Sequence, residues 1–378
     1  MSKKDFFIDQ KDSTAIKLKF YRDYIESYLI KVLMQFGVCF IGDLFSGPGR
    51  NGKEKGSPLV LVEIAHKILG SEILQKKQRG QCRIFILFND QNSSFIDDLK
   101  KELSSEKDSN IKIFIKSESF SDAMGEDLLG DLKSKKIPAF IFLDPFNYST
   151  VQMSKLKQLL AIPFLEVLFF CPTFHAYRFA SSKNLPEKLK EFLKDFTFDG
   201  IVDYQSPYYF IESICKRLKK ELETEFIRDI TIDVGSSKNT LFYITKHIGG
   251  MIIMNRLFLK ESLDGRCIQV KEVKKLEQSP PLFKKSQIET AQFKKRIESY
   301  QLRLLEDLKK NKKMTNKEII FHSVVGGFLP MHAEALISKL KKENKVEYKY
   351  LLNEKKIGPY ISEQNWNKEL CVISYKNV

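Results

Sequence analysis

The chain has 378 residues, of which 43% are hydrophobic and 29% are charged, and its formal net charge is +15 at pH 7. This composition supplies a sizeable core and excludes wholesale disorder, and the length suffices for one large domain and a smaller one. The basic balance favours polyanionic partners, which are DNA, RNA or an anionic membrane face, although a Lys-rich composition alone produces the same charge.

The six cysteines follow no metal-binding or disulfide pattern. None lies in a Cys-x-x-Cys pair or near a suitable His, so we expect no zinc site and no disulfide framework. The N-terminus has no apolar signal-peptide segment, and the longest apolar run, Ile162–Cys171, is too short to span a membrane and contains Glu166. We therefore expect a cytoplasmic protein without a membrane partner.

Helices and strands are expected to alternate along the first half of the chain. An amphipathic helix over Thr14–Gln35 comes first, and its aromatic residues are expected to pack in the core. Short apolar runs predict buried strands at Val38–Ile41, Arg83–Phe88, Ile111–Ile115, Ala139–Leu143 and Leu165–Phe170. Helices are predicted at Leu59–Leu69 (with Ser57 as its N-cap), Ser93–Leu103, Asp122–Lys133, Val151–Leu160, Leu185–Phe196 and Phe210–Leu222. This alternation predicts a parallel sheet covered on both faces.

Two further strands are predicted to close this sheet. Asp229–Val234 and Thr240–Thr245 are separated by a short Gly- and Ser-containing turn, which favours a hairpin. A parallel sheet closed by an antiparallel pair is the arrangement of Rossmann-like methyltransferases. We therefore expect an α/β fold with a Rossmann-like, class I methyltransferase-type sheet over residues 1–262, followed by a polar linker over 263–285.

The region 286–378 is expected to form a small helical domain. The predicted elements are a charged helix at Gln287–Lys310, a helix starting at Thr315 or Asn316, a helix at His332–Glu343, and strands at Lys345–Leu351 and Cys371–Ser374. Helix, turn, helix and two strands predict a winged helix-turn-helix domain. The basic charge favours a nucleic acid over a protein as its partner, with DNA favoured over RNA.

The most informative motif follows the first predicted strand and reads Asp43-Leu44-Phe45-Ser46-Gly47-Pro48-Gly49. Glycines let a backbone approach a ligand closely, and an acidic residue before them can hold the methionine ammonium of S-adenosylmethionine. We therefore assign cofactor binding to Asp43, Phe45, Ser46, Gly47 and Gly49. The alternative is an ordinary strand-to-helix turn. A P-loop is disfavoured because Glu54 stands where its Ser or Thr is needed, and the dinucleotide fingerprint fits poorly.

Polar residues after the next two strands are expected to complete the cofactor site. Asp90 is the first choice for the ribose hydroxyls, with Asn89 as a second contributor, because ligands bind at the carboxyl ends of such strands. Helix capping by one of the two is the alternative. Ser117, after the third strand, is assigned to the adenine side from its position alone.

The catalytic residues are assigned to Asp144, Pro145, Phe146 and Asn147, which follow the fourth strand. Amino-methyltransferases carry an acidic or amide residue, two prolines and an aromatic here, so that oxygens accept bonds from the target amine and the ring stacks on a flipped base. This chain has one proline, and its aromatic comes one position early. Asp144 could still orient an amine or act as a base. The alternative is that Asp144 only caps a turn at the end of the strand.

The residues after the fifth strand offer a weaker alternative chemistry. Cys171 precedes Pro172, whereas a cytosine C5 mechanism needs Pro before Cys, so we interpret Cys171 as a core thiol. His175, Tyr177 and Arg178 are candidates for lining the cleft, and Arg178 for contacting phosphate.

Taken together, these motifs give the chain a resemblance to the bacterial and phage three-Cys-motif partner family. The resemblance rests on the Lys- and Tyr-bearing first helix, the Asp43–Gly49 motif, Gly56-Ser57-Pro58, Asp144-Pro145-Phe146 and Leu241–His247. It covers roughly residues 14–260. The resemblance implies a fold related to S-adenosylmethionine methyltransferases and association with a separate protein that carries the three cysteines. Family members usually have Gly where this chain has Asn147.

Two functions follow from the sequence. The first is an S-adenosylmethionine-dependent, methyltransferase-like enzyme acting on nucleic acid or a modified base. The second is a non-catalytic DNA-binding or adaptor module with a degenerate methyltransferase fold.

Overall fold

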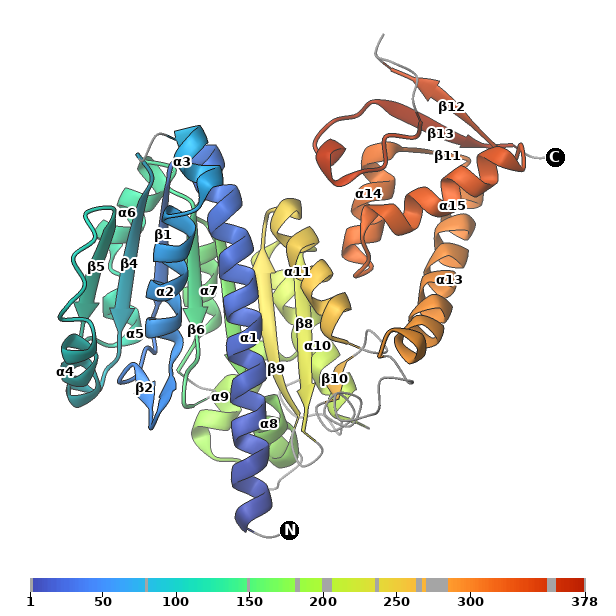
Figure 1. The fold of residues 1–378 in the computed structure, drawn as a ribbon. Coiled ribbons are helices and arrows are strands. Elements are labelled where there is room, and N and C mark those ends of the chain that lie inside the picture. Colours follow the sequence, from blue (N-terminus) through green and yellow to red (C-terminus); the bar gives the residue numbers. More distant parts are fainter. Residues whose placement is uncertain are drawn as a thin grey trace. The chain divides into compact units, whose positions relative to one another are not determined.

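The computed structural model of the chain (Figure 1) divides into two compact units, Met1–Lys246 and His247–Val378. The structure describes residues 3–78, 81–147, 150–180, 184–198, 206–234, 238–262, 267–269, 285–351 and 358–376. The division falls earlier in the chain than the boundary expected after residue 262. Most of the predicted linker, 263–285, lies outside the described residues.

The first unit is built on one mostly parallel sheet. Its strands are β1 (Val38–Asp43), β4 (Arg83–Asn89), β5 (Ile111–Lys116), β6 (Ala139–Leu143), β7 (Leu165–Cys171), β8 (Ile227–Asp233) and β9 (Lys238–Thr245). They lie in the order β8-β9-β7-β6-β1-β4-β5. The pairs from β7 to β5 are parallel, whereas β9 runs antiparallel to both β7 and β8. The sequence-based prediction of a parallel sheet closed by an antiparallel pair is therefore confirmed.

Strand β1 lies in the middle of the parallel part. It pairs with β4 on one side and β6 on the other, which sets Asp43 opposite Phe88 and Phe142. Asn89 at the end of β4 lies opposite Lys116 at the end of β5. Because parallel strands end at the same edge, the segments that follow β1, β4, β5 and β6 meet there, as expected for a ligand site in such a sheet.

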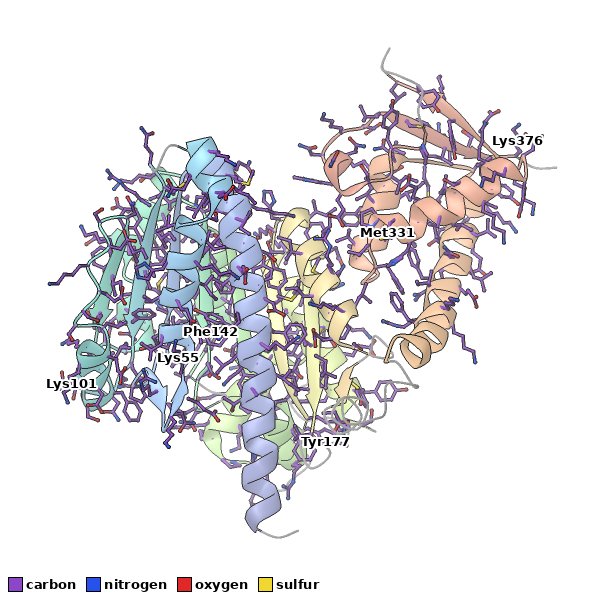
Figure 2. The ribbon with its side chains drawn as sticks, viewed as in Figure 1. Lys55, Lys101, Phe142, Tyr177, Met331 and Lys376 are labelled. Carbon is purple, nitrogen blue, oxygen red and sulfur yellow. The ribbon has the colours of Figure 1, made fainter. Side chains whose placement is uncertain are left out.

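Both faces of the sheet are buried, which explains the continuous apolar runs. Strand β6 is buried along its whole length. Phe140 and Phe142 pack against tyrosines of α1 (Lys3–Phe36), whereas Ile141 and Leu143 belong to the core on the opposite face. Figure 1 shows α1 crossing one face of the sheet, and Figure 2 marks Phe142 behind it.

Most predicted helices of the first unit are present, and two additional ones appear. The helices after α1 are α2 (Ser57–Leu69), α3 (Glu72–Gln78), α4 (Ser93–Glu102), α5 (Phe120–Ala123), α6 (Glu126–Ser134), α7 (Met153–Leu160), α8 (Thr173–Ala180), α9 (Glu187–Phe196) and α10 (Pro207–Leu222). The short helices α3 and α8 were not expected from the sequence. The single helix expected at Asp122–Lys133 is two helices, because Met124 leaves the helical conformation and Gly125 caps α6. The N-cap of α2 is Gly56 rather than Ser57, which is its first residue.

The second unit combines helices with a small antiparallel sheet. Its elements are α11 (Ile248–Glu261), β10 (Cys267–Gln269), α13 (Lys285–Asn311), β11 (Lys313–Thr315), α14 (Asn316–Val325), α15 (Pro330–Lys342), β12 (Val346–Tyr350), the 3-10 helix η1 (Glu363–Asn365) and β13 (Cys371–Tyr375). The sheet has the order β11-β13-β12. Thr315 caps α14 in a capping box with Glu318, as one of the two expected caps.

Buried asparagines hold the second unit together. Asn316 donates to the carbonyl oxygens of Tyr360 and Lys368 and accepts from the backbone N–H groups of Leu370 and Cys371, so it fixes α14 to the segment that enters β13. Asn255 of α11 donates to the carbonyl oxygens of Val324 and Phe328 at the end of α14. These bonds explain why α11, which the sequence did not predict as a helix, belongs to this unit.

Candidate functional site

The turn after β1 has the conformation that its glycines were expected to provide. Gly47 and Gly49 have φ angles of +61° and +83°, which favour glycine over other residues. A Cβ atom at Gly49 would lie 2.9 Å from Leu99 Cδ1, whereas one at Gly47 would meet no atom within 4 Å. The turn therefore packs tightly against α4 at Gly49 and leaves open space beside Gly47.

Asp43 ends β1 and lies in the interior with poorly satisfied oxygens. Its side chain is fully buried, and the Ser57 hydroxyl and the Phe45 N–H approach the carboxyl group without making a hydrogen bond of good geometry to either oxygen. Burial raises the pKa of this carboxyl group to about 7, the nearby Asp144 adds to the rise, and Ser57, the backbone of Phe45 and Lys17 oppose it. A buried carboxylate with two poorly satisfied oxygens is costly, and a cationic ligand would relieve that cost.

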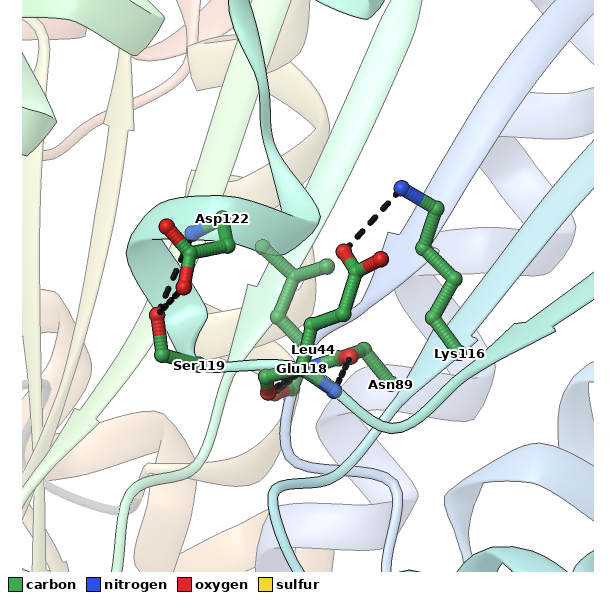
Figure 3. A network of polar contacts seen from close by, with 6 residues as sticks. All are labelled: Leu44, Asn89, Lys116, Glu118, Ser119 and Asp122. Carbon is green, nitrogen blue, oxygen red and sulfur yellow. Dashed lines mark hydrogen bonds and ion pairs between the residues drawn. The ribbon is translucent and has the colours of Figure 1, made fainter.

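Asn89 and Asp90 lie beside the turn, but their side chains already make bonds within the protein. Asn89 donates to the carbonyl oxygens of Leu44 and Glu118 and accepts from the Glu118 N–H, as Figure 3 shows. Asp90 accepts from the N–H groups of Gly47, at 3.0 Å, and Asn92, at 2.9 Å. Both residues therefore shape the glycine turn. The N-cap of α4 is Asn92, so neither Asn89 nor Asp90 caps that helix.

The other assigned cofactor residues surround the same turn. Ser46 is buried and donates from both its N–H and its hydroxyl to the carbonyl oxygen of Asn89. Phe45 is half-buried, and its ring packs 5.7 Å from that of Phe120 in α5. Ser117 is exposed after β5. The structure thus brings Asp43, Phe45, Ser46 and the glycines into one turn, with Ser117 after the end of β5, which β4 separates from β1.

Lys17 is a site residue that the sequence did not identify. Its ammonium nitrogen lies 2.5 Å from Asp144 Oδ2 and 4.6 Å from the centroid of the Phe170 ring. The Lys17 side chain is 11% exposed and that of Asp144 is 25% exposed. The first helix therefore places a positive charge at the ends of β6 and β7. The helical spacing from Tyr21, one turn later, is the only sequence signal that could have indicated this position.

The three residues after Asp144 differ in their exposure. Pro145 is buried and fixes the backbone after β6, whereas Asn147 is exposed. Phe146 is 80% exposed. An aromatic ring beside the proposed acceptor carboxylate is therefore free to stack on a planar group. Tyr148, the next aromatic residue in the chain, lies outside the described residues.

A buried polar network fixes α1 across the sheet beside this site. The hydroxyl of Tyr24 donates to Glu166 of β7 and lies 2.5 Å from the hydroxyl of Tyr243 of β9, and Thr245 donates to Glu166 over 3.5 Å. Burial raises the pKa of Glu166 to about 7, and its hydroxyl partners oppose that rise. No sequence pattern indicated that Glu166 connects α1, β7 and β9 in this way.

The residues after β7 form α8 rather than a second reactive centre. Cys171 is fully buried, and burial raises the pKa of its thiol, so it is the core thiol that was expected. Tyr177, labelled in Figure 2, packs 6.1 Å from the Phe210 ring of α10. His175 and Arg178 are exposed on α8. Among the described residues, no three His, Cys, Asp or Glu side chains gather as a metal site requires.

The second unit carries most of the excess positive charge. Lys and Arg outnumber Asp and Glu by 26 to 15 in residues 247–378, but by only 37 to 33 in residues 1–246. On α15, Met331, Lys339 and Lys342 are exposed, and Met331 is labelled in Figure 2. The basic residues of this helix therefore gather in its last turn, and an exposed apolar residue lies in its first turn. No helix within the described ranges combines the length and apolar character that crossing a bilayer needs.

Comparisons with known proteins leave the chain without an assigned family. No family model matches the chain, and no curated protein matches it significantly. The functional argument therefore depends on the geometry of the site and on the motifs.

The first prediction concerns the pH dependence of stability. The folded Asp43 carboxyl group has a pKa of about 7, so the native state binds its proton more tightly than the unfolded chain does. This contribution to stability is present at low pH and is lost as the pH rises to 7. Between pH 5 and 8, the free energy of unfolding of the wild type should therefore fall by about 2–3 kcal/mol more than that of Asp43→Asn. Urea titrations measure this difference.

The control for this experiment is Asp97→Asn, which changes an exposed carboxylate on α4. Its stability should follow the wild-type pH curve. Parallel curves for Asp43→Asn and the wild type would contradict a proton held by Asp43. Glu166→Gln should show a similar but separate effect, because burial raises the pKa of Glu166 as well.

Proposed function

We propose that the protein is a cytoplasmic, S-adenosylmethionine-dependent, methyltransferase-like enzyme that acts on nucleic acid or a modified base, together with a separate three-Cys-motif protein. The observation that carries the proposal is Asp43, a buried acidic group at the end of the central strand whose oxygens make no well-formed hydrogen bond. It lies at the start of a glycine turn, where the methionine ammonium of the cofactor would satisfy it.

The sheet supports this proposal. Its parallel strands are closed by β9, which runs antiparallel between β7 and β8. Rossmann-like methyltransferases have such an arrangement, with their cofactor at the carboxyl end of the first strand. A sheet of this kind hosts other chemistries too, so the argument for function depends on the site.

The residues at the turn fit S-adenosylmethionine in part. Asp43 would accept bonds from the cofactor ammonium, and the open space beside Gly47 would let the backbone approach it. Asp90 and Asn89 would hold the turn in place through their existing bonds. The exposed Ser117 would face the adenine of the cofactor. When bound, this cofactor supplies a methyl group on a sulfonium centre. The protein's own contribution would be to orient it and to exclude water.

The acceptor side would be formed by Asp144 and Phe146. The Asp144 carboxylate can accept a hydrogen bond from an amine and can hold its proton. The exposed Phe146 ring offers a stacking surface for a base, as flipped or unpaired bases require. Pro145 would hold the two in a fixed relation.

The second unit would bind the nucleic acid. Its order of helix, short strand, two helices and two strands supports a winged helix-turn-helix interpretation, with α15 as the recognition helix. Lys339 and Lys342 on that helix would contact phosphates, and the basic excess of residues 247–378 would strengthen binding. DNA remains favoured over RNA, because a helix of this kind fits the major groove of DNA.

Two observations favour the second candidate function, a non-catalytic DNA-binding or adaptor module. Asp144 is occupied by Lys17, and the side chains of Asn89 and Asp90 bond within the protein. A degenerate site would show such internal pairing. The poorly satisfied oxygens of Asp43 favour a working cofactor site instead, because burying them without a ligand is unfavourable.

The cofactor assignment is tested by calorimetry with S-adenosylmethionine. Wild-type protein should bind it, and Asp43→Ala should bind it about 10- to 100-fold more weakly, because a hydrogen bond to a charged group contributes about 1.5–3 kcal/mol. Asp97→Ala is the matched control and should bind as the wild type does. Absence of binding to folded wild-type protein would contradict the enzyme proposal.

The reaction is tested by mass spectrometry of nucleosides. DNA and RNA from cells that express the chain with its three-Cys-motif partner should contain a nucleoside heavier by one methyl group. Cells expressing Asp43→Ala should lack it. Identical nucleoside profiles in both strains, with cofactor binding intact in the wild type, would favour the non-catalytic module.

The nucleic-acid role of α15 is tested by the salt dependence of DNA binding. Lys339→Ala/Lys342→Ala should weaken binding to a short duplex and reduce the slope of log K against log salt by about 2, since each phosphate contact contributes nearly one counterion. The control is Lys294→Ala/Lys295→Ala, which removes two exposed lysines from α13. An unchanged slope in the α15 variant would reject this interface.

A further inference from the structure

Asp144 and the Phe170 ring form a small cation-binding site, which Lys17 of the same chain fills. Its ammonium group lies between the Asp144 carboxylate, at 2.5 Å, and the face of the Phe170 ring, at 4.6 Å from the centroid. A carboxylate together with an aromatic face stabilises an alkylammonium group by charge and by cation–π attraction. The Lys17 side chain is only 11% exposed, so solvent screens this interaction little.

The surroundings contain a second acidic group and more polar capacity than Lys17 uses. Asp43, whose oxygens make no well-formed hydrogen bond, is close enough that Lys17 lowers its pKa and Asp144 raises it. The hydroxyl of Tyr21, one helical turn after Lys17, is also buried without a hydrogen-bond partner. The two carboxylates come from the ends of the neighbouring strands β1 and β6. The ammonium group of Lys17 is therefore shared by two acidic groups, Asp144 and Asp43.

This site distinguishes between kinds of amine. Exchange of one ammonium for another preserves the charge balance, whereas a neutral occupant would leave Asp144 partly buried without a counter-charge. An aliphatic amine carries a full positive charge at neutral pH, but the exocyclic amine of an aromatic base does not. The pocket therefore favours an aliphatic amine over an unmodified base amine.

We propose that Lys17 holds the place of an aliphatic amine of the substrate, which displaces it from Asp144 when the substrate binds. This inference rests on the proposed function, and it narrows the acceptor to a nucleic acid or modified base that carries an alkylamine group. Lys17 then acts as a built-in competitor. It pairs with Asp144 in the free protein and yields only to a group of its own charge.

The test is chemical rescue of Lys17→Ala by methylammonium, followed by thermal unfolding of the full chain. The substitution empties the pocket, so the melting temperature should fall. Methylammonium chloride at a saturating concentration should raise it by about 2–4 °C more than an equal concentration of sodium chloride does. Wild-type protein and Lys19→Ala should show no such difference. Lys19 is a suitable control because it lies on the same helix, is 45% exposed and pairs with Asp23 at 3.7 Å.

Further arms decide between the remaining explanations. Aniline, whose amine is neutral at pH 7.5, should give no rescue, and Lys17→Ala/Asp144→Asn should lose the response to methylammonium. Lys17→Met keeps the side-chain length and serves if Lys17→Ala does not fold. Equal responses of folded Lys17→Ala and wild type, or failure of both single variants to fold even with methylammonium present, would overturn the inference.

This outcome is separate from that of the proposed function. Rescue reports on the pocket without any cofactor, whereas calorimetry with S-adenosylmethionine reports on the turn at Asp43. Rescue without cofactor binding would retain the amine pocket and reject the enzyme. Cofactor binding without rescue would reject the amine pocket and leave the proposed cofactor site standing.

Discussion

Burying the Asp43 carboxyl group without a well-formed hydrogen bond is unfavourable, and the residues around it limit that cost only in part. Lys17, Ser57 and the backbone of Phe45 favour the charged form, yet burial still raises the pKa to about 7. The central strand, the glycine turn and the first helix all converge on this group. The site is therefore arranged around a charge that the protein alone does not satisfy, and the functional argument follows from that imbalance.

The two acidic groups are linked because the sheet is parallel. Strands β1 and β6 are neighbours in register, so Asp43 and Asp144 reach the same edge, where α1 crosses with Lys17. The network of Tyr24, Glu166 and Tyr243 fixes that helix to β7 and β9. Buried polar networks of this kind hold one arrangement, so the position of Lys17 also depends on contacts outside the site. Asn89 and Asp90 fix the glycine turn in a similar way. The sequence analysis assigned their side chains to the ribose hydroxyls, but in the structure these side chains bond to the protein itself.

The sequence predicted most of the strands because both faces of a parallel sheet are apolar, and such runs stand out. Ala139–Leu143 was predicted to its exact bounds, and the turn at Gly47 followed from its residue types. Short helices such as α3 and α8 were missed because they lack a long apolar period. The pair of Lys17 and Asp144 joins residues 127 positions apart, so only the tertiary fold reveals it. The same holds for Glu166, which lies inside a predicted strand and whose bonds to α1 and β9 only the tertiary fold reveals.

The most direct test of the central claim is the number of protons released when S-adenosylmethionine binds at pH 6.5, measured by calorimetry in buffers of different ionisation enthalpy. If Asp43 holds a proton with a pKa of about 7 and gives it up to pair with the cofactor ammonium, the wild type should release about 0.8 proton. Asp43→Asn should release none. Binding to the wild type without proton release, or no binding at all, would contradict the account.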